Sequence, residues 1–333
     1  MKIGLFTDIH IGLESDNPFF HKENIKLANW IKEEFQKNKI KTIVILGDIF
    51  HHRERIVLES LHNAREFFSI LNDFKIHIIT GNHDCFYRDN SSVHSLGLLQ
   101  VNASNISVYD KPTVIDLDAS IAMIPWGTGL DDIPSADYVM GHFEIAGFEM
   151  QGTVCEKGLT GAELVKKAKH AVLSGHFHKP QVRAYGKREI HYLGSPYQHN
   201  FGEAGEDKFI YILDMESHEL EAIKNEISPK HFYVKQGETD FGKYSNCIVK
   251  PVITDPDNQD EFMTKINSVS PAKVNQAEIV LENVTKTKET VEEFKSTNFH
   301  EDVKTFVFDI MEIDDNMKED VVNAALELYE SIN

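Results

Sequence analysis

The chain has 333 residues, more than one average domain, and its 41% hydrophobic and 26% charged content is ordinary for a globular protein. No stretch approaches the ~18 consecutive apolar residues that a membrane span requires, and a net charge of −19 argues against tight unassisted binding to nucleic acid. The three cysteines are far apart, and the N-terminal apolar run is broken by Asp8 and His10 with no cleavage site after it. We therefore expect reduced thiols in a cytoplasmic protein without membrane association.

From residue 1 to about 215, short apolar runs alternate with amphipathic stretches. The stretches Glu23–Lys37 and Leu58–Leu71 carry apolar residues at helical spacing and predict helices. The short runs are rich in β-branched residues and end at Gly, Asp or Asn, which predicts strands. These runs are Lys2–Phe6, Thr42–Leu46, Ile76–Thr80, Ile121–Ile124, Tyr138–Met140, Ala171–Ser174, Ile190–Leu193 and Phe209–Leu213. The alternation predicts an α/β domain with largely buried sheets over residues 1–215.

The character of the sequence changes after Asp214. Residues 216–283 hold the strand-like runs Phe232–Lys235, Cys247–Val252 and Ala277–Leu281 among Asp/Pro/Asn turns, and predict a small α+β accessory domain. Residues 284–333 are acidic and end in the amphipathic stretch Met317–Ser331, which predicts a helix. This terminal helix either docks on a partner protein or packs on its own domain.

Five short polar motifs follow the predicted strands. They are Asp8-Ile9-His10, Gly47-Asp48-Ile49-Phe50-His51, Gly81-Asn82-His83-Asp84, Gly141-His142 and Gly175-His176-Phe177-His178. Loops at the carboxyl ends of strands in an α/β sheet converge on one crevice, so we expect these side chains to meet there. A lone D-x-H or Gly-His dipeptide is background, but five such loops together predict a metal site.

The ligand set indicates which metals bind. It offers carboxylates, an amide oxygen and imidazoles but no thiolate, which suits Mn²⁺, Fe²⁺ or Zn²⁺ in a non-structural site. Seven ligands are too many for one ion, and they fit two ions that share a bridging carboxylate. The predicted ligands are Asp8, His10, Asp48, Asn82, His142, His176 and His178.

The ordered motifs resemble those of the calcineurin-like metallophosphoesterases, whose fold is a four-layered α/β/β/α sandwich. Gly-Asp-Ile-Phe-His, Gly-Asn-His-Asp, Gly-His-Phe-His and Leu193-Gly194-Ser195-Pro196 in this order are most similar to the SbcD-type nucleases, and the modest length is most like their T-even phage members. These proteins are the nuclease subunits of double-strand-break repair complexes and pair with a coiled-coil ABC ATPase. The resemblance covers residues 1–215 strongly and the rest only in general layout.

The resemblance implies specific roles for the motif residues. Asp8, His10, Asp48 and His178 would hold one ion, and Asp48, Asn82, His142 and His176 the other, with Asp48 bridging. His51 and His83 would contact the scissile phosphate, and His83 would either donate a proton to the leaving oxygen or stabilise the transition state. Asp84, next to His83, would hold that imidazole in one tautomer.

The resemblance also implies an activity and partners. The activity would be Mn²⁺-dependent hydrolysis of DNA phosphodiesters by a water activated between two ions, as 3′→5′ double-strand exonuclease and single-strand endonuclease in repair and recombination. Mg²⁺ or another divalent ion is the alternative cofactor, and the setting would be the cytoplasm of a bacterial or phage-infected cell. A homodimer contact would lie on Leu58–Leu71 and Val93–Val101, although the same apolar face can equally be core.

A DNA nuclease with a net charge of −19 requires an explanation. Basic residues near the motifs can form a rim around the cleft, although each alone is more often a solvated charge; they are Arg53, Arg55, Arg88, Lys179, Arg183, Lys187 and Arg188. Even so, the chain alone should bind DNA weakly and in a salt-sensitive manner. The ATPase partner would supply the main DNA-binding surface.

Two other hypotheses about the function remain open. One is a phosphomonoesterase or small-molecule phosphodiesterase on the same scaffold, and the other is a non-catalytic scaffold with a vestigial site. The complete ligand set argues against the second. Most remaining histidines are expected at the surface or in packing, while His191 and His199 flank Gly194-Ser195-Pro196 and can line the cleft.

Overall fold

A computed structural model describes residues 1–280, except 89, 101–102 and 151, together with residues 318, 321 and 322. The chain divides into two compact units, residues 1–280 and 281–333. Most of the acidic C-terminal segment, including most of the terminal helix expected there, lies outside the described residues. No helix in the described part of the chain is both long and apolar enough to cross a membrane.

The first of two six-stranded sheets has the order β14-β13-β1-β2-β3-β4. Strands β1 to β4 run parallel, while β13 and β14 are antiparallel to their neighbours. Every residue of β2 is buried, which is expected for a parallel strand covered on both faces. The strands are β1 (Lys2–Phe6), β2 (Thr42–Ile45), β3 (Lys75–Ile79), β4 (Ile106–Tyr109), β13 (Phe209–Asp214) and β14 (Leu220–Lys224).

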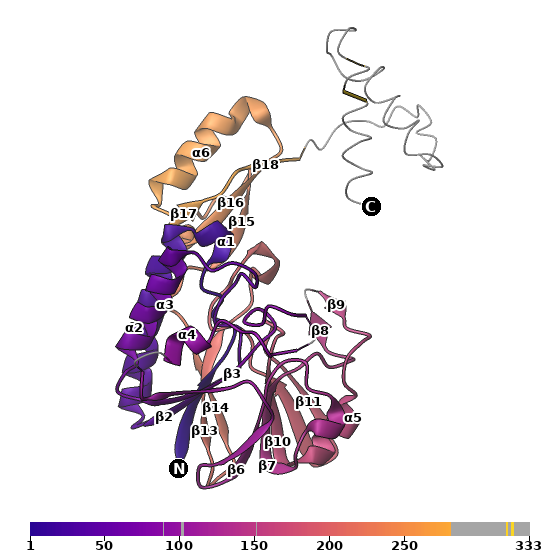
Figure 1. Ribbon diagram of the computed structural model, residues 1–333. Helices are drawn as coiled ribbons and strands as arrows, with labels where there is room; N and C mark the ends of the chain where they lie inside the picture. Colours follow the sequence, from indigo (N-terminus) through magenta and orange to yellow (C-terminus); the bar gives the residue numbers. More distant parts are fainter. Residues whose placement is uncertain (89, 101–102, 151, 281–317, 319–320, 323–333) are drawn as a thin grey trace. The chain divides into compact units, whose positions relative to one another are not determined.

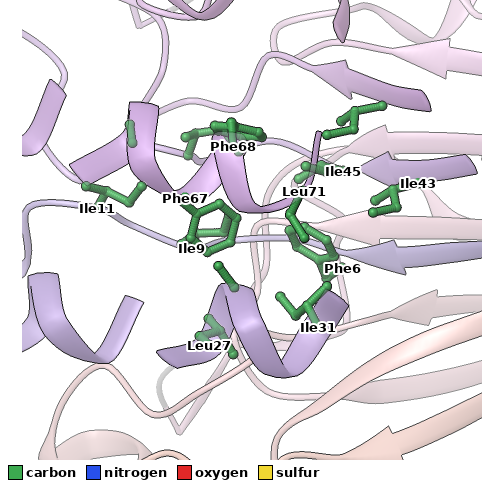
Figure 2. Packing of buried hydrophobic residues seen from close by; sticks show 14 of the residues in the cluster. Phe6, Ile9, Ile11, Leu27, Ile31, Ile43, Ile45, Phe67, Phe68 and Leu71 are labelled. Atoms are coloured by element: carbon green, nitrogen blue, oxygen red, sulfur yellow. The ribbon is translucent and has the colours of Figure 1, made fainter. Parts of the chain in front are cut away.

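Two helices, α2 (Pro18–Lys37) and α3 (Leu58–Ile70), cover the outer face of this sheet (Figure 1). The Asn17 side chain accepts a hydrogen bond from the Phe19 amide at 3.0 Å and so caps α2. Figure 2 shows side chains of both helices, including Ile31 and Phe67, packed against Phe6 of β1. The apolar face that the spacing predicts for each helix therefore packs against the sheet.

The second sheet has the order β11-β12-β10-β7-β6-β5. Strands β12, β10, β7 and β6 are parallel, and β11 and β5 close the edges in antiparallel fashion. The strands are β5 (Thr113–Asp116), β6 (Ser120–Ile124), β7 (Ala136–His142), β10 (Ala168–Gly175), β11 (Gln181–Tyr185) and β12 (Arg188–Tyr192).

The two sheets face each other across an apolar core. Leu5 and Val44 from the first sheet and Met123 and Met140 from the second belong to one buried cluster. The outer face of the second sheet is covered by loops and the one-turn helix α5 (Gly161–Leu164), and Phe148 and Cys155, which flank the short hairpin of β8 (Glu149–Met150) and β9 (Thr153–Val154), pack in the same cluster. The expected four-layered α/β/β/α sandwich is confirmed, with a thin fourth layer.

A small α+β substructure follows the sandwich within residues 1–280. Strands β15 (His231–Lys235), β16 (Ile248–Ile253), β17 (Lys273–Val274) and β18 (Glu278–Ile279) form a parallel sheet, and helix α6 (Gln259–Ser268) covers it with Phe262 and Ile266. The remaining helices, α1 (Leu13–Asp16) and α4 (Gly97–Gln100), are single turns. Strand β14 lies beyond residue 215 and still extends the first sheet.

Candidate metal centre

The seven predicted ligands lie together at the carboxyl ends of five strands. Asp8 and His10 follow β1, Asp48 follows β2 and Asn82 follows β3, and these strands are parallel neighbours. In the other sheet β7 ends at His142, and β10 ends directly before the loop with the last two ligands. The sandwich places these strand ends at one edge, as predicted.

Asp48 occupies the middle of the cluster. Its Oδ2 atom lies 3.4 Å from Nε2 of His10 and 3.4 Å from Nε2 of His142. Its Oδ1 atom accepts a hydrogen bond from the His83 amide at 2.8 Å, which fixes the carboxylate plane. Asp48 therefore faces two groups of ligand atoms at once, which is the position that a bridging carboxylate requires.

One ligand group contains Asp8, His10 and His178. Nε2 of His10 lies 3.2 Å from Nε2 of His178 and 3.9 Å from Oδ1 of Asp8. The Asp8 carboxylate is oriented by the Thr7 hydroxyl at 2.7 Å and the His176 amide at 3.1 Å. The Asp8 carboxylate is thus fixed by one side-chain hydroxyl and one backbone amide from the neighbouring ligand loop.

The other ligand group contains Asn82, His142 and His176. Nδ1 of His142 lies 2.7 Å from the Leu46 carbonyl, so this nitrogen carries a proton and Nε2 faces the cluster. Nε2 lies 2.9 Å from Oδ1 of Asn82. The Trp126 ring packs against the imidazole of His176, with centroids 4.9 Å apart.

The backbone at the cluster is unusual. Asp8, His10 and Asp48 have φ angles of 53°, 52° and 53°, and His176 has a φ of 88°. These left-handed conformations are strained for residues with side chains, and such strain concentrates at functional sites. Gly81 has no side chain because a Cβ there would collide with the Asp48 carboxylate and amide.

Burial sets the protonation of the cluster. It lowers the pKa of His10 and of His176 to about 3, so both imidazoles are neutral at pH 7. Burial opposes the charge on Asp48, but the neighbouring imidazoles outweigh it and hold the pKa of Asp48 well below its usual value. For His142, burial is likewise outweighed by Asp48, which raises the pKa of His142 to about 9.

A divalent cation fits this arrangement. The Asn82 amide oxygen lies 2.9 Å from Nε2 of His142, and Nε2 of His178 lies 3.2 Å from Nε2 of His10. Oxygen and imidazole nitrogen atoms, the donor types that divalent cations bind, thus converge inside the buried cluster. Groups of such atoms lie within 4.8 Å of one another, and Asp48 belongs to two of the groups. Burial keeps His10 and His176 neutral, the state in which an imidazole binds a metal, and a bound cation would take the place of the proton that the raised pKa leaves on His142.

His51 and His83 lie beside the ligands, and the Asp84 carboxylate makes its hydrogen bonds to backbone amides rather than to His83. Nδ1 of His83 lies 2.6 Å from the His51 carbonyl, and Nδ1 of His51 lies 3.3 Å from Nδ1 of His10. The Asp84 carboxylate instead accepts hydrogen bonds from the backbone amides of Ile49, Phe50 and Gly81. The hydrogen-bond partner of Nδ1 of His83 is therefore the His51 carbonyl, where the sequence predicted the Asp84 carboxylate.

The predicted basic rim separates into two sets. Arg53, Arg55 and Arg88 line a cavity of about 1080 Å³ together with His51 and His83. Among the residues that the structure describes, these three guanidinium groups have no carboxylate partner.

The other four basic residues have different surroundings. Lys179 forms an ion pair with Glu149 at 2.6 Å, and Arg183 donates to the Gly147 carbonyl. Arg188 donates to the Val165 carbonyl, and Lys187 lines a separate cavity. These four residues lie on the second sheet and its loops, and three of them are held there by the contacts given.

Sequence reasoning missed the residues that orient His178. Oε1 of Glu203 lies 2.9 Å from Nδ1 of His178, and Lys208 pairs with Oε2 of Glu203 at 2.7 Å while donating to the His178 carbonyl. The His199 ring packs against those of His10 and His178, whereas His191 contacts Glu189. A carboxylate behind a ligand histidine has no fixed sequence spacing, so the only available signal was Glu203 close after Gly194-Ser195-Pro196.

The fold and the ligand set together define a metal-dependent phosphoesterase. The calcineurin-like phosphoesterase superfamily domain matches residues 1–218, and the chain belongs to this superfamily. The resemblance drawn from the motifs is thereby confirmed.

Individual proteins are also similar to the chain. Exonuclease subunit 1 of Enterobacteria phage T4 is 28% identical over 344 residues, which cover 99% of this chain and 98% of that protein. The DNA polymerase II small subunit of Methanothermobacter thermautotrophicus is 22% identical over 231 residues, which cover 58% of this chain and 46% of that protein. The solved structure of a novel archaeal phosphodiesterase is 17% identical with a TM-score of 0.39, over 68% of this chain and 100% of that one.

Proposed function

We propose that the chain is a metal-dependent DNA nuclease that hydrolyses phosphodiester bonds as one subunit of a larger complex. The observation that carries this proposal is the position of Asp48, whose Oδ2 atom lies 3.4 Å from one imidazole of each ligand group. The cluster adjoins a cavity lined by three arginines, which suits a polyanionic substrate. The 28% identity to a phage exonuclease subunit along nearly the whole chain supports DNA as that substrate.

The ligand residues divide between two ions. Asp8, His10, Asp48 and His178 would hold one ion, and Asp48, Asn82, His142 and His176 would hold the other. When bound, two such ions polarise the phosphate and lower the pKa of water, and they favour in-line displacement. We propose Mn²⁺ as the physiological ion, with Mg²⁺ as the alternative.

His83 and His51 act on the phosphate. The His51 carbonyl fixes the proton of His83 on Nδ1, which leaves Nε2 as the nitrogen that exchanges a proton with the leaving oxygen. Burial, followed by the nearby His83, lowers the pKa of His51 to about 4, so His51 is neutral at pH 7 and can donate one hydrogen bond to the phosphate. Arg53, Arg55 and Arg88 then bind neighbouring phosphates along the strand.

A single assay tests this function. The purified full-length protein with Mn²⁺ is offered linear duplex DNA, single-stranded DNA and p-nitrophenyl phosphate. We expect cleavage of both DNA substrates and its loss in Asp48→Ala, whereas Asp116→Asn, which alters an exposed carboxylate on β5, keeps full activity. Cleavage of the nitrophenyl ester alone would show a phosphomonoesterase instead.

The net charge of −19 supports a partner for DNA binding. We propose a coiled-coil ABC ATPase as that partner and residues 284–333 as the docking segment, with a homodimer contact on Leu58–Leu71 and Val93–Val101. Deleting Met317–Asn333 is expected to abolish ATPase association in pull-down experiments and to spare Mn²⁺-dependent cleavage. Loss of both together would mean that the segment packs on its own domain.

A further inference from the structure

Two adjacent aromatic side chains stand exposed next to the candidate metal centre. Phe86 is 48% exposed and Tyr87 is 47% exposed. Their rings meet edge to face, with centroids 5.1 Å apart and an interplanar angle of 90°. Scattered apolar residues are common on protein surfaces, but a pair of aromatic rings left in water beside a catalytic cleft is typical of a binding site.

The turn that carries these rings is firmly anchored. Cys85, directly before Phe86, is fully buried and pairs with His94 in an isolated β-bridge. The Phe86 amide donates a hydrogen bond to the Val93 carbonyl at 2.9 Å. The backbone on both sides of the turn is therefore held in place, and the exposure of the two rings is a property of the fold.

The same turn is joined to the metal centre. The indole N–H of Trp126 donates to the Arg88 carbonyl at 2.8 Å, and the Trp126 ring packs on His176. Phe86 and Arg88 line the cavity that also contains His51 and His83. An aromatic surface, unpaired guanidinium groups and the proposed catalytic histidines thus share one cavity of about 1080 Å³.

We propose that Phe86 and Tyr87 form a stacking platform for unpaired nucleobases of a single strand whose phosphates bind the arginines of the cavity. This inference rests on the proposed nuclease function and adds how the strand is held. A nucleic-acid strand carries flat bases next to anionic phosphates. The cavity offers an aromatic face for a base beside cationic groups for the phosphates. Every base has a π-face, so such a platform binds without sequence preference.

The platform selects single strands over intact duplex. Inside a duplex, each base is already stacked on its neighbours and paired, so its face is not available to a protein side chain. A frayed end or a single strand exposes that face at little cost. Phe86 and Tyr87 therefore favour strand ends and single-stranded segments at the metal centre.

The test compares strands with and without bases. Affinities are measured by fluorescence anisotropy on full-length protein without divalent metal, for a labelled single-stranded oligonucleotide and for a strand of equal length built from abasic sugar-phosphate units. The variants are Phe86→Ala, Tyr87→Ala and the conservative Phe86→Trp, and the control is Val182→Ala, which alters an exposed residue on β11.

Each alanine variant is expected to bind the base-bearing strand about 5- to 150-fold more weakly, the range that one lost base–aromatic stack produces. Affinity of each alanine variant for the abasic strand should stay within about twofold of the affinity of the original protein. Phe86→Trp should retain binding of the base-bearing strand, because it keeps an aromatic ring at this position. Equal losses for the two strands, or no loss for either, would overturn the stacking proposal. Because wild-type cleavage of DNA with Mn²⁺ is scored separately, failure of the nuclease function is distinguishable from failure of the platform.

Discussion

Asp84 joins two of the loops that deliver ligands, and its replacement gives a sharp test of its role. The carboxylate is buried and accepts hydrogen bonds from the amides of Ile49 and Phe50 through Oδ1, at 3.0 and 3.2 Å. Its Oδ2 atom accepts from the Gly81 amide at 3.0 Å. The motif after β2 and the motif after β3 are therefore tied together by one side chain.

The cost of replacing Asp84 follows from these three contacts. In Asp84→Asn, the remaining oxygen can keep two of the donors, but the new amide group faces the Gly81 N–H, and one buried donor is left unmet. Such a donor costs about 1–3 kcal/mol of the free energy of unfolding. Asp84→Ala leaves three donors unmet and should cost about 3–9 kcal/mol, a large part of the ~5–15 kcal/mol by which domains are stable.

Urea denaturation of the metal-free variants measures this loss, and Asp116→Asn serves as the matched control, with a change of less than about 0.5 kcal/mol. We expect Asp84→Asn to retain measurable DNA cleavage because the carboxylate positions backbone and does not transfer a proton. A variant with unchanged stability and no cleavage would refute this reasoning and restore the catalytic role that the sequence predicts for Asp84.

Three further predictions concern groups around the centre. Glu203→Gln should weaken Mn²⁺ binding about 10- to 100-fold in isothermal titration, since the Glu203 carboxylate orients His178; an unchanged dissociation constant would contradict this. Gly81→Ala should abolish Mn²⁺ binding and lower the melting temperature, because the added methyl group displaces the Asp48 carboxylate, and normal binding would show that the loop can yield. Burial raises the pKa of Cys85 to about 12, so iodoacetamide at pH 8 should label this thiol only after unfolding, and rapid labelling of the folded protein by mass spectrometry would disprove it.

The sequence predicted the central strands and the meeting of the motif residues because both follow from local pattern. A strand buried on both faces, such as β2, is a continuous apolar run, and each ligand stands within a few residues of such a run. The edge strands β5 and β11 were missed because they are largely exposed and their polar residues hide the alternation.

The partners of the ligands could not be predicted, because they come from distant parts of the chain. Glu203 reaches His178 across 25 residues, and Asp84 reaches Ile49 across 35. Charge clusters are equally ambiguous in sequence: Lys179 directly follows a predicted ligand, yet its ammonium group pairs with Glu149. Contacts of this kind depend on the tertiary fold, and no local spacing records them.

The left-handed backbone at Asp8, His10, Asp48 and His176 makes the stability of the folded protein depend on bound metal. Each such conformation costs about 1 kcal/mol or more, so the metal-free fold carries a local penalty at its most functional point. Ions that bind only the folded chain stabilise it by about 2.7 kcal/mol for each site when their free concentration is a hundred times the dissociation constant. The lifetime of the chain should therefore depend on the free divalent-ion concentration, and metal starvation would remove the protein as well as its activity.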